Sequence, residues 1–370
     1  MKIKKTTKET ADGILADMEA MDEQTPLATG MDKKGLLSSG SSLLNKACSG
    51  SIRGAFLKGH YYILVGDSSS GKTFLSMTCF AEAEKNRYFR EHRLIYDNVE
   101  DGCLPDMNRL FNEATAKRVE PPACDKKGNP EYSFTIEDFY INMDNAISKG
   151  KPFIYVLDSM DSLSSDYELN KFQEAKDARE KGKDVAGSYG DGKAKKNSEN
   201  IRRICKGLRD TGSILIILSQ TRDNLGFGFE TKSRAGGRAL KFYATLEIWS
   251  SVAGVIKKTV MGKERKIGIH SLLQIKKNRL TGLLNEVTVD IYPSYGIDDI
   301  GSCVDYLIGE GAWEKEKAGV TVPEWGFSGK RESLIAFIEK ESKEAELLTM
   351  VSKCWEEIDE KSSLKRQKKY

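Results

Sequence analysis

The stretch GDSSSGKT at residues 66–73 has the residue types and spacing of a phosphate-binding loop. It fits the pattern G-x-x-x-x-G-K-[ST], in which two glycines let successive backbone N–H groups point at one anion. In that pattern Lys72 reaches the β- and γ-phosphates, and the Thr73 hydroxyl holds Mg²⁺. The sequence therefore predicts a nucleoside triphosphate site. The predicted nucleotide-binding residues are Gly66, Asp67, Ser68, Ser69, Ser70, Gly71, Lys72, Thr73 and Phe74.

Acidic residues follow two further apolar runs. Asp158 ends FIYVLD, where a second ligand of the Mg²⁺ shell belongs, so Thr73 and Asp158 are the predicted metal residues. LIYDNVEDG (94–102) carries three acids, Asp97, Glu100 and Asp101, beside the expected phosphate site. One of these carboxylates could polarise the attacking water as a general base, and spacing alone does not choose among the three.

A segment at 214–245 carries a second kind of chemistry. The buried run ILIIL leads into Ser219-Gln220 and then into a glycine-rich stretch with aromatic and cationic residues. Such a stretch suits a loop that stacks on bases while it grips phosphates. It equally suits a lid over the nucleotide with its phenylalanines in the core. The pattern leaves both interpretations open.

Short apolar runs alternate with helical stretches across the middle of the chain. These runs are YYILV (61–65), LIY (94–96), FIYVL (153–157), ILIIL (214–218), FYATLEIWS (242–250), HSLLQI (270–275) and EVTVDIY (286–292). The first four are continuous, as in strands covered on both faces, and the last three lean toward alternation, as in antiparallel or half-covered strands. A helix is expected over 74–86, directly after the phosphate loop. This order predicts a doubly wound α/β core.

Three regions divide the chain at about residues 37 and 295. The first, 1–36, is a polar arm with one amphipathic segment of Ala11, Ile14, Leu15, Met18 and Met21 at helical spacing. Residues 37–294 are the core, and 295–370 are a small region that contains Trp313 and Trp325. That region has a helical segment at about 330–358. The basic tail at 361–370 is a frayed end or an electrostatic handle, with the frayed end favoured.

The segment 166–197 interrupts the core and is rich in Lys, Gly and Asp. It is either a solvated surface insertion or a mobile basic loop that orders on a polyanion. A core-facing helix is expected after it, because Ile201, Ile204, Cys205 and Leu208 stand at helical spacing.

Composition narrows the functional classes. The chain has 370 residues and a net charge of only +3, so any nucleic-acid-binding face must be local. Its seven cysteines and three histidines are scattered, which argues against a Cys/His metal cluster and fits reduced thiols in a cytoplasm-like compartment. No secretory signal pattern or membrane-spanning apolar run is expected.

Several motifs in order make a resemblance specific. The phosphate loop, the strand-end Glu, the DS at 158–159, the Gln at 220, AGGRALKFYAT (235–245) and IKKNRLTG (275–282) resemble bacterial RecA and its bacteriophage relatives, over about residues 40–310. The resemblance implies a RecA-like ATPase fold with a mostly parallel central sheet and flanking helices, a small N-terminal helical arm and a small C-terminal α/β region. It also implies an ATP- and Mg²⁺-dependent, DNA-dependent ATPase that acts in recombination and repair. For a bacteriophage member, the compartment would be the cytoplasm of a bacterial host.

The resemblance also assigns catalytic roles. Glu100 falls on the family's catalytic glutamate, although Asn98 stands where the family has an acid, and Lys72 neutralises phosphate charge. Gln220 falls on the glutamine that senses the γ-phosphate and couples it to a DNA loop. Lys277 and Arg279 match the basic pair that one subunit donates to the ATP of its neighbour.

The resemblance places two DNA loops, at about 162–197 and 221–237, and puts Lys241 and Phe242 in the subunit interface. The predicted DNA-binding residues are Arg222, Leu225 (as an apolar wedge), Phe227, Phe229, Lys232, Arg234, Gly236, Gly237 and Arg238. The implied partners are single-stranded DNA, homologous duplex DNA and further copies of the chain in a filament. Mediator and single-strand-binding proteins are further expected partners.

Two other functions share parts of this pattern. A hexameric helicase or translocase shares the phosphate loop, Glu100 and Asp158, but not the 235–245 segment followed by KNR. A non-hydrolysing recombination accessory protein is the third hypothesis, and Asn98 favours it slightly. The basic C-terminus also departs from the acidic tail of bacterial RecA, so that mode of regulation is not expected.

Overall fold

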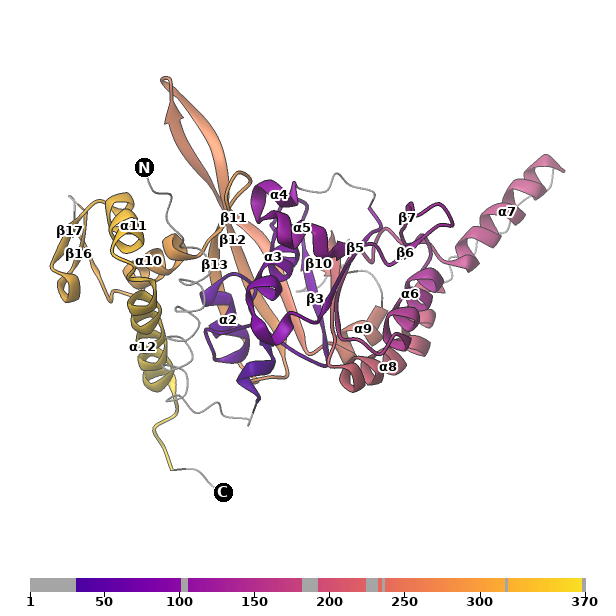
Figure 1. The fold of residues 1–370 in the computed structure, drawn as a ribbon, viewed down its shortest axis with the longest axis horizontal. Coiled ribbons are helices and arrows are strands. Elements are labelled where there is room, and N and C mark those ends of the chain that lie inside the picture. The colour runs from indigo at the N-terminus through magenta and orange to yellow at the C-terminus, as the bar shows by residue number, and fades with distance from the viewer. Residues whose placement is uncertain are drawn as a thin grey trace.

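The structure is a computed structural model, and it describes residues 31–100, 106–181, 192–223, 232–234, 237–316 and 319–367. Within these ranges, ten strands form one sheet in the order β14-β13-β12-β11-β3-β9-β8-β4-β5, with β10 paired to β9 (Figure 1). The strands are β3 (His60–Gly66), β4 (Arg93–Asn98), β5 (Val119–Glu120), β8 (Phe153–Asp158), β9 (Ile214–Asp223), β10 (Lys232–Arg234), β11 (Leu246–Val260), β12 (Lys263–Asn278), β13 (Glu286–Tyr292) and β14 (Gly296–Asp298). The neighbours β11-β3-β9-β8-β4-β5 are parallel, and β11 to β14 pair antiparallel.

Helices cover both faces of this sheet, because alternate residues of the central strands point to opposite sides. Tyr62 and Leu64 of β3 pack in a core with α2 (Ser42–Ser49) and α3 (Lys72–Lys85). Tyr61, Ile63 and Val65 pack on the other face, in a core shared with three further helices. These helices are α6 (Ile136–Ser148), α8 (Gly192–Thr211) and α9 (Gly237–Tyr243). The result is a three-layer α/β/α core.

Shorter elements complete the core. Two more small sheets pair β1 (Leu36–Leu37) with β2 (Phe56–Leu57) and β6 (Ala123–Cys124) with β7 (Pro130–Glu131). The short helices are α4 (Met107–Leu110), α5 (Glu113–Arg118) and the 3-10 turns η1 (Lys33–Gly35) and η2 (Arg87–Phe89).

The C-terminal region is a small α/β unit. It consists of α10 (Asp299–Gly309), β15 (Glu314–Glu316), β16 (Gly319–Val322), η3 (Pro323–Trp325), β17 (Phe327–Gly329), α11 (Arg331–Lys340) and α12 (Glu344–Ser362). Trp313 and Trp355 belong to the same continuous apolar core as α2 and α3. β14, which follows the predicted boundary at residue 294, pairs with β13 and so extends the core sheet. The helix expected over 330–358 is two helices, α11 and α12.

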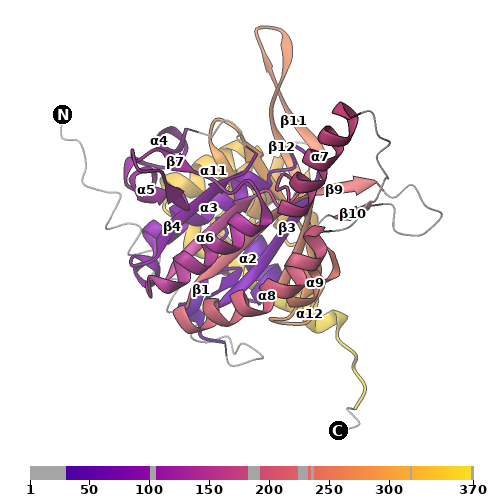
Figure 2. The same cartoon turned by 90° about the vertical axis from the view of Figure 1, so that its right-hand side faces the viewer.

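Two elements project from the body at the edge where the parallel strands end (Figures 1 and 2). One is the β11–β12 hairpin, which continues past Ser250, the partner of Gly66, to a tip where Met261 is 96% exposed. The other is α7 (Asp166–Glu180), which begins at the N-cap Ser165 and has no buried residue. None of the helices in the described parts of the chain combines the length and the apolar character of a membrane span.

Two local predictions were wrong. Part of the expected loop at 166–197 is the helix α7, because its Glu, Lys, Gln and Ala residues favour a helix and Ser165 caps it. The expected strand at 242–250 begins only at Leu246, since residues 237–243 form α9 and bury Leu240 against the sheet.

Candidate functional site

The phosphate loop joins the end of β3 to the start of α3. Gly71 is the N-cap of α3 with φ +99°, a left-handed conformation that favours glycine. A Cβ on Gly66 would collide with Ser250, and a Cβ on Gly71 would collide with Ile291. α3 has no side-chain cap, so the N-terminal amides of this helix are available to an anion. These features fit the phosphates of a nucleotide.

Lys72 lies inside this loop. Its Nζ donates hydrogen bonds of 2.8 Å to the carbonyl oxygens of Gly66 and Asp67. Burial lowers the pKa of Lys72, and the nearby carboxylates of Asp158 and Glu100 oppose that shift. The ammonium group is therefore held among backbone acceptors and acids, at the position from which a lysine of this pattern contacts phosphate.

Thr73 and Asp158, the predicted metal residues, are in direct contact. Thr73 Oγ1 donates to Asp158 Oδ2 at 2.9 Å, and the Tyr96 hydroxyl donates to the same oxygen at 2.8 Å. Burial raises the pKa of Asp158, and the hydrogen bonds from Tyr96 and Thr73 partly offset that shift. A hydroxyl beside a buried carboxylate is a donor set that suits Mg²⁺, because oxygen ligands are those that this ion prefers.

Two of the three candidate acids in 94–102, Asp97 and Glu100, differ in burial in the structure. Asp97 is fully buried and accepts hydrogen bonds from the Ser133 N–H (2.9 Å), the Ser133 hydroxyl (2.6 Å) and the Tyr155 hydroxyl (2.6 Å). Because these groups occupy its carboxylate inside the core, Asp97 has a structural role. Glu100 lies outside the core, next to the end of β8, where its N–H donates to the Asp158 carbonyl at 3.1 Å. Asp101 lies outside the described residues.

Glu100 is bonded to two neighbouring strand ends. Its Oε1 accepts a hydrogen bond of 2.7 Å from Ser159 Oγ and one of 2.9 Å from Gln220 Nε2. Ser159 follows β8 directly, whereas Gln220 lies near the end of β9. The proposed base and the proposed phosphate-sensing glutamine are thus in direct contact.

Lys277 and Arg279 lie away from this site. In the sheet, Lys277 lies opposite Glu247 of β11, and Glu247 lies beside Ile63, in the middle of β3. The Arg279 N–H donates to the Thr245 carbonyl, and Thr245 is bonded to Tyr61 at the start of β3. The phosphate loop lies beyond the opposite end of that strand, so the structure does not bring this pair to the phosphate loop of the same chain.

Both cations contact the end of α9 instead. Lys277 Nζ donates to the carbonyls of Lys241 and, at 2.8 Å, of Phe242, and Arg279 Nη2 donates to the Phe242 carbonyl at 2.6 Å. The Arg279 guanidinium also lies 5.4 Å from the centre of the Phe242 ring, which is 63% exposed. Cations at a helix C-terminus stabilise its unpaired carbonyls.

Comparison with known proteins finds similarity to RecA proteins. A family model described as the RecA N-terminal domain matches residues 154–298. The protein RecA of Cytophaga hutchinsonii is 25% identical over 68% of this chain and 63% of its own length. The protein RecA of Rhodopseudomonas palustris is 24% identical over 77% of this chain and 73% of its own length. That of Streptococcus pneumoniae is 25% identical over 76% of this chain and 67% of its own length.

The chain is similar to RecA proteins over most of its length, and the family model covers residues 154–298. The predicted fold class, a RecA-like α/β core around a mostly parallel sheet, is confirmed. The family model begins inside β8, so the phosphate loop and Glu100 lie before the matched region. The chain spans 63% of the length of the Cytophaga relative that it matches.

The predicted DNA-binding residues are only partly described. Leu225, Phe227, Phe229 and Gly236 lie outside the described residues. Arg222 lies in β9, and Lys232 and Arg234 lie in β10, which pairs antiparallel with β9 so that Arg234 is opposite Thr221. Gly237 and the exposed Arg238 begin α9. This predicted DNA loop therefore starts directly after Gln220, and its Arg234 lies opposite Thr221.

Sequence reasoning missed Asp161. Its Oδ2 accepts hydrogen bonds from Ser219 Oγ (2.8 Å) and from the backbone N–H of Gln220 (2.7 Å). The signal was available in DSMDSL, because a second acid three residues after Asp158 remains at the edge where the parallel strands end.

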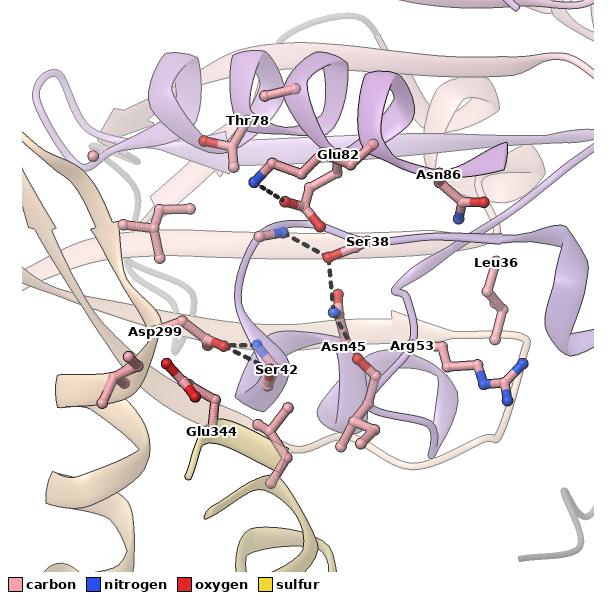
Figure 3. Close-up of a pocket in the computed structure, with 18 of the residues that line it drawn as sticks. Leu36, Ser38, Ser42, Asn45, Arg53, Thr78, Glu82, Asn86, Asp299 and Glu344 are labelled. Atoms are coloured by element: carbon pink, nitrogen blue, oxygen red, sulfur yellow. Dashed lines mark hydrogen bonds and ion pairs between the residues drawn. The ribbon is translucent and has the colours of Figure 1, made fainter. Parts of the chain in front are cut away.

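A pocket of about 820 Å³ lies elsewhere in this chain (Figure 3). Its walls come from α3 and η2, the segment from η1 to α2, the end of α4, and residues of β14, α10 and α12. Ser42, Glu82, Asp299 and Glu344 line it, whereas Lys72 and Glu100 do not. The site built by the phosphate loop is distinct from this pocket.

Proposed function

We propose that this chain is an ATP-dependent recombinase. It assembles into filaments on single-stranded DNA in the cytoplasm, pairs that DNA with a homologous duplex, and hydrolyses ATP to ADP and phosphate. The observation that carries the proposal is the hydrogen bond from Gln220 to Glu100, because Gln220 lies on the strand that leads directly into the predicted DNA loop at 221–237. A contact between base and glutamine is what an ATPase controlled by DNA requires.

The nucleotide would be held by the phosphate loop. Lys72 and the amides at the start of α3 would neutralise the phosphate charge, and Thr73 and Asp158 would hold Mg²⁺. When bound there, Mg²⁺ would supply positive charge against the negative charge that develops during phosphoryl transfer. Glu100 would accept the proton of the attacking water, because its carboxylate lies beside Ser159 at the end of β8.

Lys277 and Arg279 would serve the neighbouring subunit. Their distance from the phosphate loop of their own chain supports this role, since they lie toward the other end of β3. A head-to-tail contact between copies would carry the pair to the next phosphate loop, and such contacts that do not close form helical filaments. The added cations would stabilise charge in the transition state.

DNA binding would rest on phosphate contacts and stacking. Arg222, Lys232, Arg234 and Arg238 are the proposed phosphate contacts, and Leu225, Phe227 and Phe229 the proposed contacts to bases. Binding would then depend little on sequence and weaken as salt rises. Mediator and single-strand-binding proteins are further proposed partners. The proposal of a bacteriophage-type member rests on the sequence motifs alone.

The test is ATP hydrolysis with and without single-stranded DNA, together with electron microscopy of the protein on that DNA with a nonhydrolysable ATP analogue. We expect DNA-stimulated hydrolysis, extended filaments and strand exchange, all lost in Lys72→Ala. Closed rings that unwind DNA without strand exchange would instead identify a helicase. ATP binding without DNA-stimulated turnover would identify an accessory protein.

A further inference from the structure

The end of β9 is held at three consecutive residues. Ser219 Oγ and the Gln220 N–H both donate to Asp161 Oδ2, at 2.8 and 2.7 Å. The next residue, Thr221, donates through its hydroxyl to Asp67 of the phosphate loop. The strand that leads into the predicted DNA loop is therefore fixed where that loop begins.

Asp161 supplies the hydrogen-bond acceptor that a neighbouring strand would otherwise give to the Gln220 N–H. The pairing of β8 with β9 ends at Leu157 and Ile217, and a last backbone bond joins the Met160 N–H to the Leu218 carbonyl at 3.0 Å. β8 ends at Asp158, and the Asp158 carbonyl accepts a hydrogen bond from the Glu100 N–H, not from the Gln220 N–H. The Asp161 carboxylate accepts that hydrogen bond instead, and bonds to an ionised acceptor are shorter and stronger than neutral ones.

The same turn also contacts Glu100. Ser159, two residues before Asp161, donates to Glu100 Oε1, and the Gln220 side chain donates to the same oxygen. Three hydrogen bonds thus join Ser159 to Glu100, Glu100 to Gln220 and Gln220 to Asp161, and the backbone between Ser159 and Asp161 closes the circuit. With the Gln220 backbone fixed by Asp161, a change at Gln220 reaches Glu100 through the side-chain amide.

We propose that Asp161 is a positioning residue, which holds the backbone of Gln220 so that DNA binding at 221–237 is transmitted to Glu100. The inference rests on the proposed function, since it assigns Asp161 a part in coupling DNA binding to hydrolysis. Asp161 would contact neither nucleotide nor DNA. Its effect passes through Gln220, to which it is bonded by the backbone N–H.

The experiment compares Asp161→Ala and Asp161→Asn with the wild-type protein. The readouts are ATP hydrolysis with and without single-stranded DNA, ATP binding and the midpoint of thermal unfolding. We expect Asp161→Ala to reduce the DNA-stimulated rate about tenfold, the size of one lost charge-assisted hydrogen bond, with the DNA-free rate and ATP binding nearly unchanged. Asp161→Asn keeps an acceptor and should lose about threefold. The control is Asp210→Ala, an exposed carboxylate that pairs with Lys206.

A second comparison tests whether Asp161 acts through Gln220. In a Gln220→Ala background, Asp161→Ala should cost no further stimulation, whereas a purely structural role would give additive losses. Undiminished stimulation in Asp161→Ala would overturn the inference, as would equal losses with and without DNA. If Asp161→Ala does not fold, Asp161→Asn decides by the same criteria. A wild-type protein without DNA stimulation would overturn the proposed function, whereas a stimulated wild type with an equally stimulated Asp161→Ala overturns only the role of Asp161.

Discussion

The side-chain amide of Gln220 donates a hydrogen bond of 2.9 Å to Oε1 of Glu100, across 120 positions of sequence. It links the end of β9 to the loop after β4, although β8 lies between these strands in the sheet. If the Gln220 amide turned to another acceptor, this hydrogen bond would break or Glu100, the proposed base, would move with the amide. Hydrogen-bonded groups of this kind act as a unit.

The first prediction concerns Gln220→Ala. Removing the amide should leave ATP binding and DNA-free hydrolysis within about twofold of the wild type but reduce DNA stimulation at least about tenfold, because one charge-assisted hydrogen bond is lost. Steady-state hydrolysis over a range of single-stranded DNA concentrations measures both rates. Gln274→Ala is the matched control, since Gln274 is bonded to Glu286 on the exposed side of β12. Full stimulation in Gln220→Ala would remove Gln220 from the coupling.

The second prediction concerns Glu100→Gln. This substitution keeps the shape and the hydrogen-bond acceptor but removes the proton acceptor, so hydrolysis should fall by about 10²–10⁴-fold, the usual contribution of a general base. ATP binding and assembly on DNA should persist. Glu113→Gln, which alters an exposed ion pair with Lys117, serves as the control. Nearly normal turnover in Glu100→Gln would assign the base to another residue.

Much of the core could be predicted from the sequence because its strands are continuous apolar runs. ILIIL lies in β9 and EVTVDIY is the whole of β13, and the helix after the phosphate loop is α3. α7 could not be predicted from composition alone, because polar residues with high helix propensity also occur in surface loops. The last residues of α9, Phe242 and Tyr243, were predicted as strand, because aromatic residues are enriched in strands.

The site was only partly predictable for a different reason. Local motifs place Asp158 at the end of one strand, and Lys72 and Thr73 at the start of the helix that follows another. Parallel strands bring such ends together. The choice between Asp97 and Glu100 depends on which one the fold buries, and that is decided by Ser133 and Tyr155, which no local pattern connects to Asp97. The bonds of Asp161 to the end of β9 likewise join segments 58 and 59 residues apart.

The third prediction uses two inactive variants. Lys277→Ala should bind ATP but lose DNA-stimulated hydrolysis, and Lys72→Ala should lose hydrolysis through its own phosphate loop. In an equal mixture, about a quarter of the contacts would join an intact phosphate loop to an intact Lys277, so about a quarter of the wild-type rate should return if the interface is head-to-tail. Steady-state hydrolysis on single-stranded DNA measures it.

Its control is a mixture of Lys72→Ala with the double variant Lys72→Ala, Lys277→Ala, which contains no intact phosphate loop and should remain inactive. A mixture of the two single variants that assembles on DNA but recovers no activity would contradict a role for Lys277 across the interface. Equal loss of ATP binding in both single variants would contradict it as well.

The fourth prediction separates Asp97 from catalysis. Asp97→Ala leaves Ser133 and Tyr155 without their acceptor in a fully buried place, so it should lower the free energy of unfolding by about 2–4 kcal/mol. Denaturant unfolding measures the loss. ATP hydrolysis per folded molecule should change little below the unfolding temperature. An unchanged stability with a large loss of turnover would return Asp97 to the candidate bases.

The fifth prediction concerns pH and the pocket in Figure 3, where Asp299 accepts hydrogen bonds of 2.7 Å from the Ser42 N–H and hydroxyl. Burial raises the pKa of Asp299 to about 6, although the bonds from Ser42 oppose the shift. The folded state therefore binds this proton more tightly than the unfolded state, in which the pKa is about 3.9. The contribution of Asp299 to stability is greatest below about pH 4 and declines as pH rises to about 6.

Asp299→Asn removes this titration while an amide can still bond to both groups of Ser42. The variant should match the wild-type midpoint of thermal unfolding near pH 3.5 and exceed it near pH 7.5, where the difference in the free energy of unfolding should reach up to about 3 kcal/mol at about 1.4 kcal/mol per pKa unit. Asp210→Asn, on an exposed helix end, should show the same difference from the wild type at both pH values. A gap between variant and wild type that is the same at both pH values would mean that Asp299 titrates alike in the folded and unfolded states, and that its burial beside Ser42 carries no ionisation cost.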